Sequence, residues 1–126
     1  MTPAAQTGDP LQGLRVLLVE DETLVAMLVE EYLSELGCVV AASVRRVHRA
    51  LETLAKVEVD AAVLDLNVAG EDVAPVADLL ESRRVPFILA SGYDQAGMSA
   101  SRWASNPMLQ KPFTLAELRQ ALLSAL

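Results

Sequence analysis

Residues 14–21 have the sequence LRVLLVED, a largely apolar run that ends abruptly at Glu20 and Asp21. A continuous run of Leu and Val is typical of a strand that is buried on both faces of a parallel sheet. In residues 23–36, apolar side chains recur at intervals of three and four, and Gly37 follows. This spacing predicts an amphipathic helix that ends at Gly37. The folded part of the chain therefore opens with a strand followed by a helix.

The same alternation continues to the end of the chain. Apolar runs predict four more strands, over 38–42, 60–65, 86–90 and 108–109. Amphipathic segments predict helices over 44–57, 72–83 and 95–103. The last helix begins at Thr114, which forms a capping box with Glu117. The whole pattern is a series of strand and helix pairs.

Strands that are apolar on both faces predict a parallel sheet with helices on both sides, because crossover connections cover both faces. Five strands and five helices fit an α/β protein of the flavodoxin-like, doubly wound (βα)5 class, with a five-stranded parallel sheet of order 2-1-3-4-5. The segment before the first strand is rich in Pro, Gly and Thr. We therefore expect residues 1–13 to form a flexible N-terminal tail and residues 14–126 to form one domain.

Composition narrows the class of protein further. The chain has 126 residues, of which 52% are hydrophobic and 21% charged, which is enough apolar surface for one core. Its net charge of −7 disfavours direct contact with nucleic acid or anionic membrane surfaces. A secretory signal has a basic segment followed by an apolar run, and the N-terminal residues lack this arrangement. The apolar runs are also too short to span a bilayer. We expect a cytoplasmic protein that binds neither nucleic acid nor membrane.

Polar residues follow four of the predicted strands. Glu20 and Asp21 follow the first strand, Asp65 ends the third, Ser91 follows the fourth and Lys111 follows the fifth. In a doubly wound sheet, ligands bind at the carboxyl ends of the strands, near the point where the strand order reverses. If the first and third strands are neighbours, three carboxylates, a hydroxyl and an ammonium group converge there.

This set of side chains suits the transfer of a phosphoryl group. Close carboxylates need a cation among them, and oxygen ligands favour Mg²⁺, or Mn²⁺, over zinc. A carboxylate such as Asp65 can accept a phosphoryl group if nearby charges are neutralised, and Ser91 and Lys111 are suited to contact the phosphoryl oxygens. Acidic residues after a strand are, by themselves, often only helix N-caps. The combination is what indicates a site.

Four short motifs occur in order along the chain: VEDE at 19–22, LDLN at 64–67, ASGY at 90–93 and QKPF at 110–113. Together they resemble the receiver domain of two-component response regulators, and the resemblance covers residues 14–126. It implies that Asp21 and Asp65 bind Mg²⁺ directly, that Glu20 helps through water, and that the backbone carbonyl of Asn67 is a further ligand.

The resemblance also implies a function and partners. Asp65 would accept a phosphoryl group from a sensor histidine kinase, and Ser91 and Lys111 would contact the phosphoryl oxygens. The chain would be a signalling domain, not an enzyme, and would act through a downstream protein target or a phosphotransfer partner. The segment around 87–93 resembles the alphaproteobacterial subgroup with a Phe-Ala-Thr-Gly-Tyr signature, whose stand-alone receivers pair with histidine kinases of the HWE type.

Two alternatives remain open at this stage. Met108 occupies the position, three residues before the Lys, where most receivers carry Tyr or Phe, so a pseudo-receiver that binds partners without phosphorylation is one alternative. The other is a phosphohydrolase of the haloacid dehalogenase type, which also forms an aspartyl phosphate. Such enzymes have a second Asp two residues after the nucleophile, where this chain has Asn67.

Overall fold

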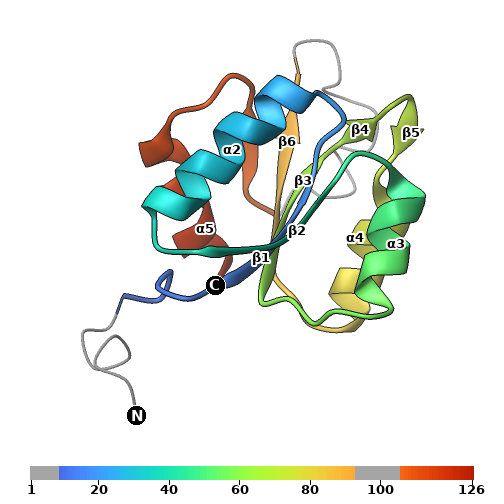
Figure 1. Cartoon of the computed structure of the whole chain (residues 1–126), viewed down its shortest axis with the longest axis horizontal. Coiled ribbons are helices and arrows are strands. Elements are labelled where there is room, and N and C mark those ends of the chain that lie inside the picture. The colour runs from blue at the N-terminus through green and yellow to red at the C-terminus, as the bar shows by residue number, and fades with distance from the viewer. Residues whose placement is uncertain (1–8, 93–105) are drawn as a thin grey trace.

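A five-stranded parallel sheet forms the centre of the protein (Figure 1). The computed structural model describes residues 9–92 and 106–126. The sheet has the order β2-β1-β3-β6-β7. Its strands are β1 (Arg15–Val19), β2 (Val39–Val44), β3 (Ala61–Asp65), β6 (Phe87–Ser91) and β7 (Met108–Gln110). Counted along the chain, this is the order 2-1-3-4-5, so the predicted flavodoxin-like sheet is confirmed.

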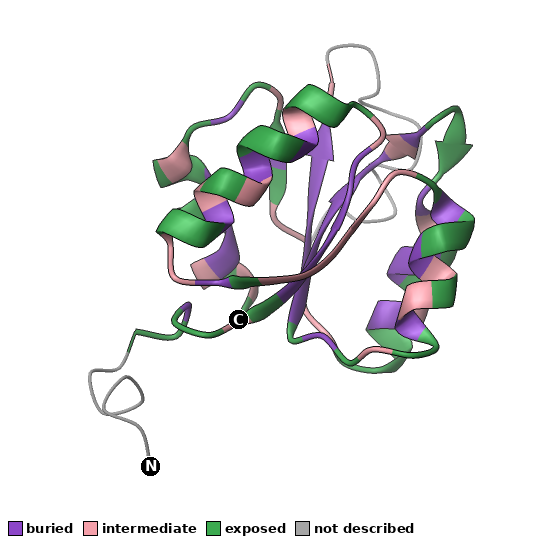
Figure 2. Cartoon of the chain, in the orientation of Figure 1, coloured by how far each residue is buried: buried purple, intermediate pink, exposed green. Residues whose placement is uncertain are grey.

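Within the described residues, two helices cover each face of the sheet. Helices α2 (Thr23–Glu35) and α5 (Leu115–Ala125) lie on one face, and α3 (Val47–Leu54) and α4 (Ala74–Ser82) lie on the other (Figure 1). The central strands are therefore buried on both sides (Figure 2). The helix predicted over 95–103 lies outside the described residues. Among the helices that the structure describes, none is long and apolar enough to cross a membrane.

The register of the sheet aligns the carboxyl ends of its strands. Val19 at the end of β1 is paired with Leu64, and Asp65 at the end of β3 is paired with Ala90. The next pair along this edge, Ser91 with Gln110, joins β6 to β7. Because all these pairings are parallel, the residues that follow each strand emerge at one edge of the sheet.

The second strand is longer than its sequence predicts, and the helix after it is shorter. Val44 is the last residue of β2, where it pairs with Val19 and its carbonyl accepts a hydrogen bond of 3.0 Å from the Glu20 N–H. The predicted helix over 44–57 was therefore wrong at its start, since α3 begins at Val47. Val44 is an apolar residue between a strand and a helix, so it fits the periodicity of both. Its pairing with β1 places it in the strand.

A small hairpin lies between β3 and α4. Strands β4 (Asn67–Val68) and β5 (Glu71–Asp72) pair in antiparallel fashion, in a region that the sequence analysis left without strands. The helix predicted over 72–83 consequently begins two residues later, at Ala74. The Asp72 carboxylate accepts a 2.7 Å hydrogen bond from the Ala74 N–H at the start of that helix. Strands of two residues are too short to show any periodicity.

Packing begins before the first strand. Leu11 is only 1% exposed and belongs to the core between the sheet, α2 and α5. The Asp9 side chain accepts a hydrogen bond from the Leu11 N–H, and the Gly13 N–H donates to the Gly37 carbonyl over 2.8 Å. Leu11, within the segment that the sequence analysis assigned to a tail, therefore packs against the domain.

Replacement of this anchor should destabilise the domain. We expect Leu11→Ala to lower the free energy of unfolding by about 3 kcal/mol, because it removes a fully buried side chain from a packed core. Leu24→Ala is the matched control, since Leu24 is 80% exposed on α2, and it should cost less than about 0.5 kcal/mol. Urea denaturation followed by circular dichroism measures both, and equal midpoints would show that Leu11 contributes nothing to the core.

Candidate functional site

Three carboxylates lie together at the carboxyl edge of the sheet. One oxygen from each of Glu20, Asp21 and Asp65 lies within 4.8 Å of the others. Glu20 and Asp65 are only 3% and 2% exposed, and Asp21 is half-buried. Like charges at this separation repel one another strongly when water is excluded. The fold thus concentrates negative charge at the carboxyl ends of the strands, where the sequence predicts the site.

Lys111 provides the positive charge that faces this cluster. Its Nζ lies 3.1 Å from Glu20 Oε1 and 3.1 Å from Asp65 Oδ2, and its side chain is 12% exposed. A longer ion pair of 3.8 Å joins it to Glu22. One ammonium group thus faces several carboxylates, so the cluster keeps an excess of negative charge.

Backbone donors hold each of the three carboxylates. The Glu22 N–H donates to Glu20 Oε2 over 3.1 Å, and the Ala69 N–H donates to Asp21 Oδ2 over 3.1 Å. The Asn67 N–H reaches Asp65 Oδ1 over a longer 3.5 Å. The N-cap of α2 is Glu22, which has no side-chain capping bond. Glu20 and Asp21 are therefore not the N-cap of this helix, so helix capping does not explain why acidic residues follow β1.

Burial dominates the proton affinities in the cluster. It raises the pKa of Glu20 to about 7; the neighbouring charge of Asp65 adds to this effect, while the Glu22 N–H and Lys111 oppose it. Burial also raises the pKa of Asp65, against the opposing effect of Lys111. For Lys111, burial lowers the pKa, but Asp65 and Glu20 more than offset this and the net shift is upward. At neutral pH the Lys111 ammonium is charged, and burial destabilises the ionised forms of Glu20 and Asp65.

The donor set fits a hard divalent cation. Within the described residues Glu20, Asp21 and Asp65 form a group that could hold a metal ion, and all three offer oxygen atoms. Mg²⁺ binds oxygen at 2.0–2.1 Å, so ligands in its coordination shell lie at most about 4.2 Å apart, and oxygens already within 4.8 Å of one another need only small movements to share one ion. A cation would also relieve the repulsion among these carboxylates, which adds to the effect of burial on the pKa values of Glu20 and Asp65.

The structure also places Ser91 and Asn67 beside the acidic cluster. Ser91 ends β6 and is buried, and its carbonyl accepts a 2.9 Å hydrogen bond from the Lys111 N–H. Asn67 begins β4, two residues after Asp65. The roles predicted for them, a phosphoryl contact for Ser91 and a metal-binding carbonyl for Asn67, stay predictions.

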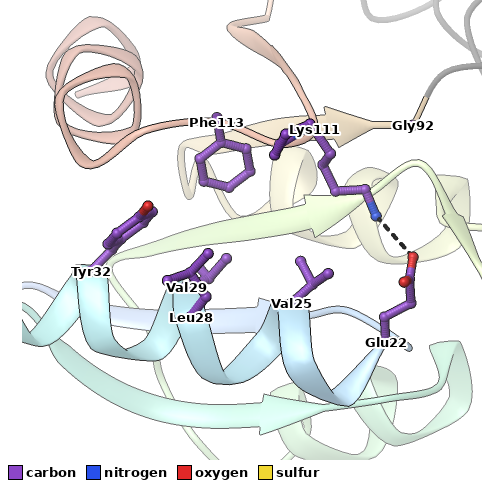
Figure 3. A pocket seen from close by; sticks show the side chains of 9 residues that line it. Glu22, Val25, Leu28, Val29, Tyr32, Gly92, Lys111 and Phe113 are labelled. Carbon is purple, nitrogen blue, oxygen red and sulfur yellow. Dashed lines mark ion pairs between the residues drawn. The ribbon is translucent and has the colours of Figure 1, made fainter.

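A groove of about 300 Å³ opens beside Lys111. Figure 3 shows Val25 and Val29 of α2 on one side of it and Phe113 on the other, with the Glu22–Lys111 ion pair at one end. Its walls are mostly apolar, so it offers a contact surface next to the charged site. The sequence analysis missed both this groove and the ion pair between Glu22 and Lys111, although Glu22 belongs to the VEDE motif.

Comparisons with known proteins agree with this geometry. The family model described as "Response regulator receiver domain" matches residues 16–123. The solution structure of SdrG from Sphingomonas melonis Fr1 is 38% identical, with a TM-score of 0.83, and the match covers 90% of this chain and 96% of that one. A response regulator receiver protein from Sinorhizobium medicae WSM419 is 28% identical, with a TM-score of 0.75 and coverage of 91% and 95%. No curated protein sequence matches.

The family match extends over most of the chain, and it includes the strands and loops that carry the acidic cluster and Lys111. The chain belongs to the response regulator receiver family. Within this family it is similar to SdrG, which has also been solved in a BeF3-activated conformation; that structure is 38% identical to this chain, with a TM-score of 0.75 and coverage of 89% and 96%.

The raised pKa of Glu20 predicts how stability depends on pH. Glu20 binds a proton more tightly in the folded state, with a pKa of about 7, than in the unfolded chain, near 4.5. With respect to this group, the metal-free protein should therefore be most stable below pH 4.5, and it should lose about 1–3 kcal/mol as the pH rises from there to 7. Urea denaturation in chelator at several pH values measures this loss.

Glu20→Gln is the control for this measurement, because the amide keeps the shape of the side chain but does not titrate. Its stability should fall less between pH 4.5 and 7 than that of the wild type. Identical slopes for the two proteins would contradict the assignment of the titration to Glu20.

Proposed function

We propose that this chain is a stand-alone response regulator whose Asp65 accepts a phosphoryl group from a histidine kinase. The observation that carries the proposal is the 3.1 Å contact between Asp65 Oδ2 and the Lys111 ammonium, within a cluster of buried carboxylates. A buried nucleophilic carboxylate with a fixed cation beside it is prepared to receive negative charge.

The reaction is a displacement at phosphorus. An oxygen of the ionised Asp65 carboxylate attacks the phosphorus of a phosphohistidine, and an aspartyl phosphate forms as the P–N bond breaks. The electron pair of that bond stays on the imidazole nitrogen, which takes up a proton. Lys111 stabilises the charge on the transferred oxygens, and Ser91 supplies a hydroxyl donor at the neighbouring strand end.

Mg²⁺ would be held by Glu20, Asp21 and Asp65, with the Asn67 carbonyl as a further ligand; Mn²⁺ is an alternative. When bound, the cation neutralises the phosphoryl oxygens and so lowers the barrier to attack by an anion. Lys111 would supply the other positive charge that balances the carboxylates and the phosphoryl group.

Partners are expected to bind through protein surfaces. Three large apolar side chains of α2, Leu24, Met27 and Leu28, are exposed, and Leu28 also lines the groove beside Lys111. Exposed apolar surface close to a reactive group suits contact with another protein. We propose a sensor histidine kinase of the HWE type as donor and a protein target or phosphotransfer partner as receiver, in the cytoplasm. Nucleic acid and membrane are not among the proposed partners, given the net charge of −7.

The output differs from that of most receivers in one respect. Met108, in the position where they carry an aromatic ring, is 38% exposed on the edge strand β7. A ring that turns inward on phosphorylation is therefore not available at this position. Met108 also keeps the pseudo-receiver alternative relevant, and the test below distinguishes the two.

Intact-mass spectrometry after incubation with acetyl phosphate tests the proposal. Wild-type protein in Mg²⁺ should gain one phosphoryl group, whereas Asp65→Asn protein, and wild-type protein in chelator, should gain none, because the nucleophile or the balancing cation is missing. Asp60→Asn is the matched control at the opposite end of β3, where the Asp60 carboxylate accepts a hydrogen bond from the Arg15 N–H. It should be phosphorylated like the wild type.

Other outcomes of this experiment would contradict the proposal. Equal labelling of Asp65→Asn protein would place the acceptor at another residue. Failure of the wild type to gain mass would favour a pseudo-receiver. Continuous release of phosphate from small phosphomonoesters would favour the phosphohydrolase alternative, which requires a general acid where this chain has Asn67.

A further inference from the structure

The hairpin that follows β3 turns through only two residues. Val68 pairs with Glu71, which leaves Ala69 and Gly70 as the loop, with φ angles of 53° and 84°. Positive φ at both central positions is characteristic of a type I′ turn, in which Asn or Gly is usual. Ala69 is therefore held in a conformation that an L residue rarely adopts.

This turn directs one backbone donor at the acidic cluster. The Ala69 N–H donates to Asp21 Oδ2 over 3.1 Å, although the two residues are 48 positions apart in the sequence. The Asn67 side chain accepts a 3.0 Å hydrogen bond from the Gly70 N–H and so holds the loop closed. The direction of the Ala69 N–H depends on the backbone angles that the loop imposes.

Asp21 depends on this bond more than its neighbours depend on theirs. Glu20 and Asp65 are each paired with Lys111 as well as with a backbone N–H. Asp21, in contrast, makes no ion pair within residues 9–92 and 106–126. The Ala69 N–H is thus what fixes the orientation of this half-buried carboxylate.

We propose that the Ala69–Gly70 turn positions Asp21 for the divalent cation, and that Gly70 is a positioning residue for metal binding. The inference rests on the proposed function, in which Asp21 is a metal ligand. Partners that orient a ligand in this way contribute to affinity without touching the metal.

Gly70 is the position at which the turn can be perturbed cleanly. No atom lies within 4 Å of a Cβ built on Gly70, so Gly70→Ala introduces no clash and disfavours only the positive φ. Gly13 offers a matched control before β1: its φ is 77°, and it too has no atom within 4 Å of an added Cβ. Gly70→Asn serves as the conservative variant, because Asn tolerates the left-handed region.

Titration calorimetry with MgCl₂ compares the four proteins. We expect Gly70→Ala to raise the Kd for Mg²⁺ roughly tenfold, as loss of an orienting partner does in other metal sites. Gly70→Asn should stay close to the wild type, and Gly13→Ala should leave the Kd unchanged while lowering the unfolding midpoint as much as Gly70→Ala does. A Kd for Gly70→Ala equal to that of the wild type would overturn the proposal.

A second measurement needs no metal. The amide proton of Ala69 should resonate downfield in the metal-free wild type, because it bonds to a carboxylate, and should move upfield in Asp21→Ala but not in Glu22→Ala. An unchanged shift in Asp21→Ala would refute the positioning contact even if Asp65 is phosphorylated. Absence of Mg²⁺ binding by the wild type would instead reject the metal site itself, and the positioning role with it.

Discussion

Lys111 lies between two buried carboxylates, 3.1 Å from each, and the rest of the site depends on this arrangement. Removing two carboxylates and an ammonium from water is costly, and their mutual attraction offsets the cost only when the geometry is fixed. The register of β1, β3 and β7 fixes it by aligning the strand ends from which these residues emerge. The cluster holds more carboxylates than Lys111 alone can neutralise, and this excess of oxygen donors is why the group could hold a divalent cation.

The two layers of helices hold the strands that carry the site in place. Because α2 and α5 cover one face and α3 and α4 the other, the central strands are buried throughout and cannot shift without losing their packing. The packed strands hold Glu20 and Asp65, which are both buried, in fixed positions at this edge of the sheet. The loops at the same edge carry Asp21, the hairpin turn and Lys111, which places adjustable backbone next to the rigid part.

Membership of the receiver family accounts for the position of the site but not for every detail around it. The exposed Met108 on β7 and the two-residue turn at Ala69 and Gly70 are features of this chain's own geometry. The first removes a ring that most receivers have, and the second gives Asp21 a backbone partner. The turn contacts the acidic cluster through Asp21, whereas Met108 lies on the edge strand that leads to Lys111.

The sequence by itself determined the class of fold, the order of the strands and the residues that gather at the site, because buried strands, amphipathic helices and the capping box at Thr114 are local patterns. Only the tertiary structure decided that Lys111 joins Glu20 to Asp65, that Leu11 enters the core, and that Ala69 reaches Asp21. These contacts link residues that are far apart in the chain. The turn at Ala69 also lies between two strands of two residues each, which are too short to show a period. They depend on strand register and on turn angles, which local periodicity does not encode.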